Sequence, residues 1–320
     1  MTGTDDVHTT TRLAFLGTPE VAVPALRALH EAGHDVALVV TAPDRRRGRG
    51  SALAPTPVKA CALELGIPVS DRVADVLDAD VALGVVVGFG TLIRAEVLRQ
   101  VPMVNLHFSL LPRWRGAAPV ERAILAGDEK TGVCLMALEK TLDTGPVYAR
   151  IEVTVLPEET AAELKARLSD IGAGLLVERL SGGFATLGTP VPQVGEAVYA
   201  SKIDRSELRL VWERPAVDLE RLVRIGRAWT IFRAKRLIVE RARIAGPAVG
   251  DERAAPAPPA PSGPPTPSGP PAPGALHGDE VVCGTGRLQL LEVRQEGRSV
   301  QSFEAWRRGA RPQLGEHLGR

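Results

Sequence analysis

The sequence predicts an α/β protein, with a mostly parallel sheet flanked by helices and a smaller β-rich domain after it. Over the first half of the chain, short apolar runs alternate with segments of helical periodicity, in a Rossmann-like pattern. A segment rich in Gly, Thr and Pro, residues 181–195, then interrupts this alternation. Short alternating runs follow it, and these are typical of a small β domain.

The elements of the first domain follow from their local patterns. Residues 81–87 form an apolar run, as expected for a strand that is buried on both faces. Thr56 and Pro57 predict a helix start, with Thr56 as the N-cap. The same criteria predict strands at 13–16, 36–40, 81–87, 103–107 and 132–138, and helices at 21–31, 57–65, 117–126 and 159–180.

The second domain has a basic helix at 217–226 and strands at 237–243, 280–283 and 288–293. Between two of these strands, residues 256–274 contain ten of the 26 prolines of the chain. This composition favours a solvated polyproline-type spacer inserted in a loop, with an SH3-type ligand as the alternative. We place the domain boundaries at 1–192, a linker at 193–211, and 212–320.

The composition excludes several classes of protein. With 44% hydrophobic and 24% charged residues among 320, the chain is typical of globular proteins. It has no apolar run of about 20 residues, so we expect no membrane span, and its polar start predicts no secretory signal. Three widely spaced cysteines lack metal-ligand spacing, which favours reduced core residues of a cytoplasmic protein.

The charge of the chain is unevenly distributed. Residues 206–320 hold 18 Lys+Arg and 13 Asp+Glu, whereas the rest of the chain holds 21 and 25. A basic loop, Pro43-Asp-Arg-Arg-Arg-Gly-Arg-Gly50, follows the second predicted strand. Both features suit contact with a phosphate backbone, although solvated surfaces are the alternative interpretation of each.

The segment from Asn105 to Pro112 is the strongest candidate for a reactive site. Asn105 and His107 lie two residues apart on a predicted strand, so their side chains share one face, and Asp143 follows in a turn. An amide, an imidazole and a carboxylate can stabilise an oxyanion and move a proton during acyl transfer to an amine. Taken singly, His107 could be a core histidine and Asp143 a turn residue.

Other chemistries lack their motifs. No G-x-G-x-x-G, P-loop, H-E-x-x-H or C-x-x-C pattern occurs, which argues against a nicotinamide cofactor, nucleotide hydrolysis and zinc catalysis.

The segment Asn105-Leu-His-Phe-Ser-Leu-Leu-Pro-Arg-Trp-Arg-Gly-Ala-Ala-Pro119 resembles the formyl-transfer signature of the methionyl-tRNA formyltransferases, in the folate-dependent formyltransferase superfamily. Leu142-Asp-Thr-Gly145 is similar to their aspartate loop, and the likeness extends from Leu13 to about Leu210. Two segments depart from the family pattern. Residues 224–232 replace a Pro- and Trp-rich segment, and the proline-rich insertion has no counterpart known to us.

The resemblance implies roles for particular residues. The catalytic trio is Asn105, His107 and Asp143, and no metal is required. The tetrahydrofolate contacts are Ser109, Leu110, Leu111 and Pro112. The contacts with the tRNA acceptor stem come from the basic loop, through Arg45, Arg46, Arg47 and Arg49. Residues 212–320 are expected to form an OB-like barrel that binds tRNA.

We therefore expect a monomeric cytoplasmic enzyme that transfers the formyl group of 10-formyltetrahydrofolate to the α-amino group of methionyl-tRNA, the initiator of translation. The alternatives are a sibling formyltransferase acting on a nucleotide-linked amino sugar, a 10-formyltetrahydrofolate hydrolase, and an inactive RNA-binding protein on the same scaffold.

Overall fold

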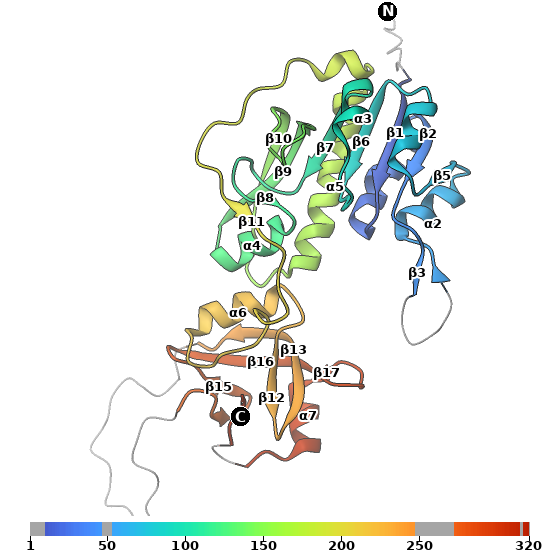
Figure 1. The fold of residues 1–320 in the computed structure, drawn as a ribbon. Helices are drawn as coiled ribbons and strands as arrows, with labels where there is room; N and C mark the ends of the chain where they lie inside the picture. The colour runs from blue at the N-terminus through green and yellow to red at the C-terminus, as the bar shows by residue number, and fades with distance from the viewer. Residues whose placement is uncertain (1–9, 47–52, 247–271, 314–315, 320) are drawn as a thin grey trace, which may run out of the picture. The chain divides into compact units, whose positions relative to one another are not determined.

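A seven-stranded sheet forms the centre of the first part of the chain in this computed structural model, which describes residues 10–46, 53–246, 272–313 and 316–319 (Figure 1). The strands lie in the order β10 (Val147–Thr154), β9 (Lys130–Ala137), β7 (Met103–His107), β6 (Leu83–Val87), β1 (Arg12–Gly17), β2 (Asp35–Val40) and β5 (Val69–Ser70). The five strands from β7 to β5 are parallel, whereas β9 and β10 are antiparallel to their neighbours. The predicted mostly parallel sheet is therefore confirmed.

Both faces of this sheet are covered. On one face, Leu16 and Val86 pack with Val76 of the 3-10 helix η2 (Val73–Asp78) and with Val97 of α3 (Ala95–Gln100). On the other face, Gly172 of α5 (Ala161–Leu180) lies so close to Leu106 and Val133 that an added Cβ would approach them to 3.4 and 3.3 Å. Burial on both faces explains why the central strands are apolar runs without alternation.

The remaining α-helices of this part begin near the predicted residues. They are α1 (Val23–Glu31), α2 (Pro57–Glu64) and α4 (Pro119–Ala126). Two 3-10 helices, η1 (Glu20–Ala22) before α1 and η3 (Phe184–Leu187) after α5, were not predicted. Thr56 caps α2 as predicted, because its hydroxyl accepts a hydrogen bond from the Lys59 N–H at 3.0 Å. The chain was expected to be helical from residue 21, but a 3-10 turn precedes α1, in which Pro24 occupies the first turn.

The second part of the chain is built around an antiparallel sheet. Its strands lie in the order β12 (Trp229–Phe232), β13 (Lys235–Ile244), β16 (Arg287–Gln295), β15 (Glu280–Val282) and β14 (Leu276–His277), and β17 (Gln301–Ser302) also pairs with β16. Two helices, α6 (Ala216–Arg224) and α7 (Phe303–Ala310), belong to it. The separate β-rich domain is thus confirmed, and β12 is a strand that the sequence patterns did not predict.

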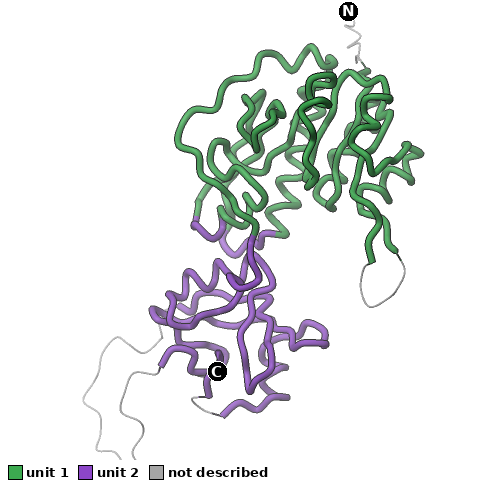
Figure 2. Tube along the Cα trace, viewed as in Figure 1, with its two compact units in different colours: residues 1–123, 128–156, 162–202 green, residues 124–127, 157–161, 203–320 purple. Residues whose placement is uncertain are grey.

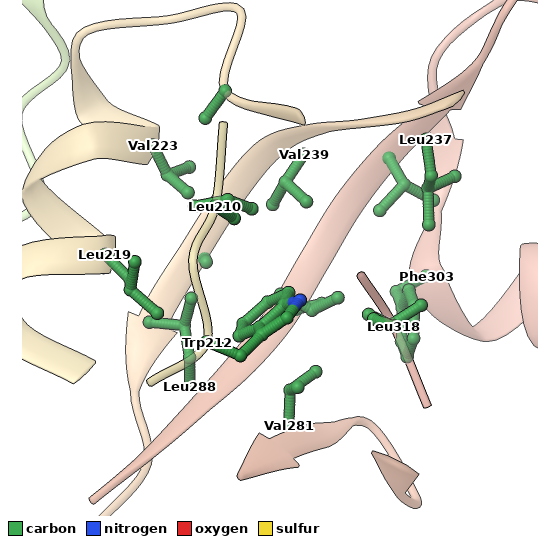
Figure 3. Packing of buried hydrophobic residues seen from close by; sticks show 14 of the residues in the cluster. Leu210, Trp212, Leu219, Val223, Leu237, Val239, Val281, Leu288, Phe303 and Leu318 are labelled. Carbon is green, nitrogen blue, oxygen red and sulfur yellow. The ribbon is translucent and has the colours of Figure 1, made fainter. Parts of the chain in front are cut away.

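Trp212 lies at the centre of the core of this second part (Figure 3). Its side chain packs among Leu210, Leu288 and residues of α6, and its indole N–H donates to the Thr230 hydroxyl at 3.0 Å. A buried tryptophan whose polar atom is satisfied in this way adds apolar contact without an unpaired donor.

The chain divides into two compact units, which comprise residues 1–123, 128–156 and 162–202, and residues 124–127, 157–161 and 203–320 (Figure 2). The change of unit at residue 203 falls inside the segment 193–211 that we expected to be a linker. The short segments 124–127 and 157–161, which group with the second unit, were not predicted. The assignment of catalytic, linker and tRNA-binding roles to these ranges remains a prediction.

The proline-rich segment lies between β13 and β14, which belong to the same sheet. That it is a solvated spacer inserted in a loop stays a prediction. Residues 256–271 of this segment lie outside the described part of the chain. Of the helices that the structure describes, none has the combined length and apolar character needed to cross a membrane.

Replacing Gly174 by Ala should stabilise the protein. This exposed glycine lies inside α5, and no atom lies within 4 Å of the position that its Cβ would take. Alanine has the higher helix propensity, so the free energy of unfolding should rise by about 0.5–1 kcal/mol in urea denaturation. Gly172→Ala is the comparison, because its methyl group would crowd Val133; an equal or larger gain at Gly172 would contradict this account.

Candidate active site

Asn105 and His107 lie on one face of β7, at the end of the parallel strands. Each is almost fully buried, with 9% and 6% of its surface exposed. They share this face with Met103, and Leu106 points to the opposite face against α5. Both neighbouring strands hold them in register, since Asn105 pairs with Val86 of β6 and His107 with Cys134 of β9. The imidazole is therefore carried by one of the most constrained segments of the fold.

The two ring nitrogens of His107 have different partners. Nε2 lies 2.8 Å from the carbonyl oxygen of Trp114. A carbonyl oxygen can only accept, so Nε2 carries a hydrogen in this arrangement. Nδ1 lies 3.7 Å from Oδ2 of Asp143, which is too long for a hydrogen bond but close enough for charge attraction. The structure thus brings together the His107 and Asp143 side chains that spacing alone could not connect.

Backbone groups fix the position of the buried Asp143. Its carboxylate oxygen Oδ2 accepts a hydrogen bond from the Gly116 N–H at 2.8 Å. Asp143 itself adopts a left-handed conformation, with φ of 51°. In the same turn, Gly145 passes so close to the Ala137 carbonyl oxygen that an added Cβ would lie only 1.9 Å from it.

Gln193 is a site residue that the sequence did not identify. Its side-chain N–H groups donate to the carbonyl oxygens of Asp143 and Gly145, at 2.9 and 2.8 Å. Its oxygen accepts from Nε and Nη2 of Arg115, at 3.0 and 2.7 Å. Gln193 therefore joins the turn of Asp143 to the loop after β7. It lies in a segment with no helical or strand pattern, so no local signal marked it.

The loop after β7 is stabilised largely by its own hydrogen bonds. The Ser109 hydroxyl donates to the Arg113 carbonyl oxygen at 2.6 Å, and the Leu111–Pro112 peptide bond is cis. Ser109 and Leu111 are buried, with 0% and 2% of their surface exposed. The loop then pairs through β8 (Arg115–Gly116) with β11 (Tyr199–Ala200). Of the four residues expected to contact folate, Ser109 and Leu111 thus direct their side chains into the protein.

Next to this loop lies a cavity of about 350 Å³. Its lining consists of Leu110, Arg113, Trp114, Asp128, Glu129, Lys130 and Thr131. The hydroxyl of Thr131 is buried there without a hydrogen-bond partner. Asn105, His107 and Asp143 are not among the residues that line this cavity.

Arg45 and Arg46 form the exposed strand β3 (Arg45–Arg46), which pairs with β4 (Leu53–Ala54) away from the main sheet (Figure 1). The base of this ribbon is fixed by Lys59, whose ammonium group contacts both carboxylate oxygens of Asp44 at 2.9 and 2.8 Å. Arg47 and Arg49 lie outside the described residues.

The three cysteines are free and buried, as predicted. Burial raises the pKa of Cys61, Cys134 and Cys283, the last to about 11, so the thiols stay protonated at neutral pH. Within the described ranges, His, Cys, Asp and Glu side chains form no cluster of three or more that could hold a metal ion.

Comparison with known proteins identifies relatives along most of the chain. A family model described as formyl transferase matches residues 11–180. The methionyl-tRNA formyltransferase of Frankia casuarinae is 42% identical and covers 96% of each chain. That of Roseobacter denitrificans is 40% identical, with 91% of this chain and 93% of the relative covered. A solved methionyl-tRNA formyltransferase from Clostridium thermocellum has the same fold, with a TM-score of 0.55 at 17% identity over 73% of this chain and 94% of that one.

Replacing Gly145 by Ala should destabilise the protein. The new methyl group meets the Ala137 carbonyl group, which belongs to the backbone at the end of β9 and cannot rotate away. We expect the free energy of unfolding in urea to fall by about 2 kcal/mol or more, the cost of forcing backbone apart. Gly174→Ala is the matched control. Equal stability of the two variants would mean that the turn of Asp143 accommodates the methyl group at little cost.

Proposed function

The chain belongs to the methionyl-tRNA formyltransferase family, and we propose that it transfers the formyl group of 10-formyltetrahydrofolate to the α-amino group of methionyl-tRNA. The observation that carries this function is the approach of Asp143 Oδ2 to Nδ1 of His107, at 3.7 Å, beside Asn105 on a buried strand. We further propose that it acts as a monomer in the cytoplasm, on initiator tRNA.

The two ring nitrogens of His107 have different roles: Nε2 orients the ring, and Nδ1 can donate a proton. Nε2 donates to the Trp114 carbonyl oxygen, which fixes the orientation of the ring. At 3.7 Å from Asp143, a proton on Nδ1 makes no hydrogen bond with the carboxylate and remains available to the formyl oxygen. The Gly116 N–H holds the Asp143 carboxylate in place beside the ring.

The transfer needs no covalent intermediate on the protein. The amine nitrogen attacks the formyl carbon, and the carbonyl oxygen becomes an oxyanion that accepts hydrogen bonds from the Asn105 amide and from Nδ1 of His107. The amine proton passes to Asp143, directly or through a water molecule. The oxyanion then re-forms the carbonyl group as the bond between the formyl carbon and N10 breaks, N10 takes the proton that Asp143 received, and tetrahydrofolate leaves.

Folate binding is assigned to the loop after β7, at Ser109, Leu110, Leu111 and Pro112. The internal hydrogen bond of Ser109 and the burial of Leu111 support a role for these two side chains in shaping the loop, which leaves the loop backbone and the partly exposed Leu110 and Pro112 to contact the ligand. Folate is a co-substrate here, and the reaction as written uses no metal.

We assign tRNA binding to the arginine ribbon and to the second unit. Arg45 and Arg46 are exposed on a ribbon stiffened by the Lys59–Asp44 ion pair, and Arg47 and Arg49 follow in the sequence. The second unit, which we propose to be an OB-like barrel over 212–320, belongs to the basic part of the chain, with 18 Lys+Arg against 13 Asp+Glu in residues 206–320.

One assay tests the function directly. Formyl transfer from 10-formyltetrahydrofolate is measured with charged initiator tRNA, with a nucleotide-linked amino sugar and with water alone as acceptor. Transfer to the tRNA, with the other two acceptors at background, supports the proposal. Preference for the amino sugar, or release of formate without an acceptor, would replace it with one of the two rival activities.

Replacing Asp143 by Asn should lower kcat by about 100-fold or more, the usual scale for loss of a charge-stabilising or proton-accepting group. The amide keeps the size of the side chain and its carbonyl oxygen still accepts from the Gly116 N–H, so thermal stability should change little. Single-turnover formyl transfer between pH 6 and 9 measures the effect. Turnover near that of the parent across this range would remove Asp143 from the mechanism.

Replacing both Arg45 and Arg46 by Ala should raise the KM for tRNA and flatten its dependence on salt. Each lost phosphate contact removes about one unit from the slope of log affinity against log salt concentration. The KM for 10-formyltetrahydrofolate should stay unchanged. Arg72→Ala, which removes an arginine with 75% of its side chain exposed, is the matched control. An unaltered slope in the double variant would show that the ribbon does not contact tRNA.

A further inference from the structure

Trp114 adopts an unusual backbone conformation at the point where the loop meets His107. Its φ is 66°, in the left-handed region that large side chains seldom adopt. This conformation directs its carbonyl oxygen to Nε2 of His107, at 2.8 Å. A strained residue of this kind persists only where its surroundings hold it, so the contacts of the Trp114 side chain decide whether the carbonyl stays in place.

Asp128 provides those contacts. Its Oδ2 accepts from the Trp114 indole N–H at 2.7 Å and from Nε of Arg113 at 2.8 Å, and its Oδ1 accepts from Nη2 of Arg113 at 2.7 Å. The guanidinium group also stacks over the Trp114 ring, with 4.4 Å between its carbon and the ring centroid. One carboxylate therefore binds three donors from two consecutive loop residues.

Asp128 is itself firmly placed. It follows α4, its backbone N–H donates to the Ala123 carbonyl oxygen at 3.0 Å, and only 15% of its side chain is exposed. Burial in this position strengthens charge-assisted hydrogen bonds compared with those on an open surface. The hydrogen bonds with Asp128 raise the pKa of Arg113, so its guanidinium group stays charged.

We propose that Asp128 is a positioning residue for formyl transfer: by holding Arg113 and Trp114, it keeps the Trp114 carbonyl against Nε2 of His107. The carbonyl confines the ring proton of neutral His107 to Nε2, so that the second proton of the ionised ring is carried by Nδ1, on the side of Asp143, from which it can be donated to the oxyanion. Asp128 does not contact the reacting atoms. This inference rests on the proposed function for its kinetic consequence, but its effect on the imidazole is independent of that function.

The test compares two variants with the parent enzyme. Asp128→Asn removes the charge and one acceptor. Trp114→Phe removes the indole N–H and replaces the indole by a smaller ring that still lies under Arg113. The control is Asp35→Asn, which removes the charge from another Arg–Asp ion pair, the exposed pair between Arg12 and Asp35. Nitrogen NMR of protein labelled with 15N-histidine reports the tautomer of His107, and its signals are assigned by their loss in His107→Gln.

We expect neutral His107 in the parent and in Asp35→Asn to carry its proton on Nε2. In Asp128→Asn and Trp114→Phe, the signals should shift towards a mixture of the two tautomers. In these variants, kcat should fall by about tenfold or more, the scale seen when the partner that orients a reactive group is lost, with the KM for tRNA changed by less than about threefold.

The possible failures are distinguishable. If the parent transfers no formyl group to tRNA, the proposed function fails, and the tautomer measurement still decides the role of Asp128. If both variants keep the parent tautomer, the inference is wrong, whatever happens to kcat, because a loss of rate alone would then reflect general disturbance of the loop. If Asp128→Asn does not fold, the tautomer of His107 in Trp114→Phe decides whether the inference holds.

Discussion

The hydrogen bond from the Gly116 N–H to the Asp143 carboxylate is the constraint on which the site depends. It joins the loop after β7 to the turn after β9, two segments that are stabilised separately and that both contain left-handed residues. Trp114, Gly116 and Asp143 have φ values of 66°, 122° and 51°. For residues other than glycine such conformations are unfavourable, so Trp114 and Asp143 keep them only where surrounding contacts hold them, and the hydrogen bond between Gly116 and Asp143 is one of these contacts. The reactive geometry is therefore a property of the assembled unit and not of any one segment.

The residues proposed for catalysis and those proposed for tRNA binding lie on parts of the chain that differ in rigidity. The groups proposed to meet the formyl carbon are carried by β7, which is buried and hydrogen-bonded on both sides. The groups proposed to meet tRNA are exposed arginines on a short ribbon and basic residues of the second unit. A reacting centre requires fixed positions, because small displacements there reduce the rate strongly. Contact with a polyanion tolerates variation, since the attraction depends on charge more than on exact geometry.

Sequence patterns predicted the elements whose cause is local. The strand at Met103–His107 and the cap at Thr56 were both correct, because burial pattern and capping chemistry depend on neighbouring residues. β10 and β12 were missed. β12 has only four residues, whereas β10 alternates between partly buried and exposed residues, a strand signal that was not recognised. The roles of Gln193 and Asp128 depend on partners 50 and 14 residues away, which no local period records. Asp143 was connected to His107 only through a family resemblance.

The buried cysteines have a consequence for measuring the protein. Cys134 lies in β9 opposite His107, and Cys283 lies just after β15, so each unit has one thiol within its sheet region. A thiol in such surroundings reacts with an alkylating reagent only when the local structure opens, because the buried, protonated form is unreactive. The rates of modification at these two positions therefore report how often each unit opens by itself. The chain therefore contains its own pair of thiols for comparing the local stability of its two units, without introduced cysteines.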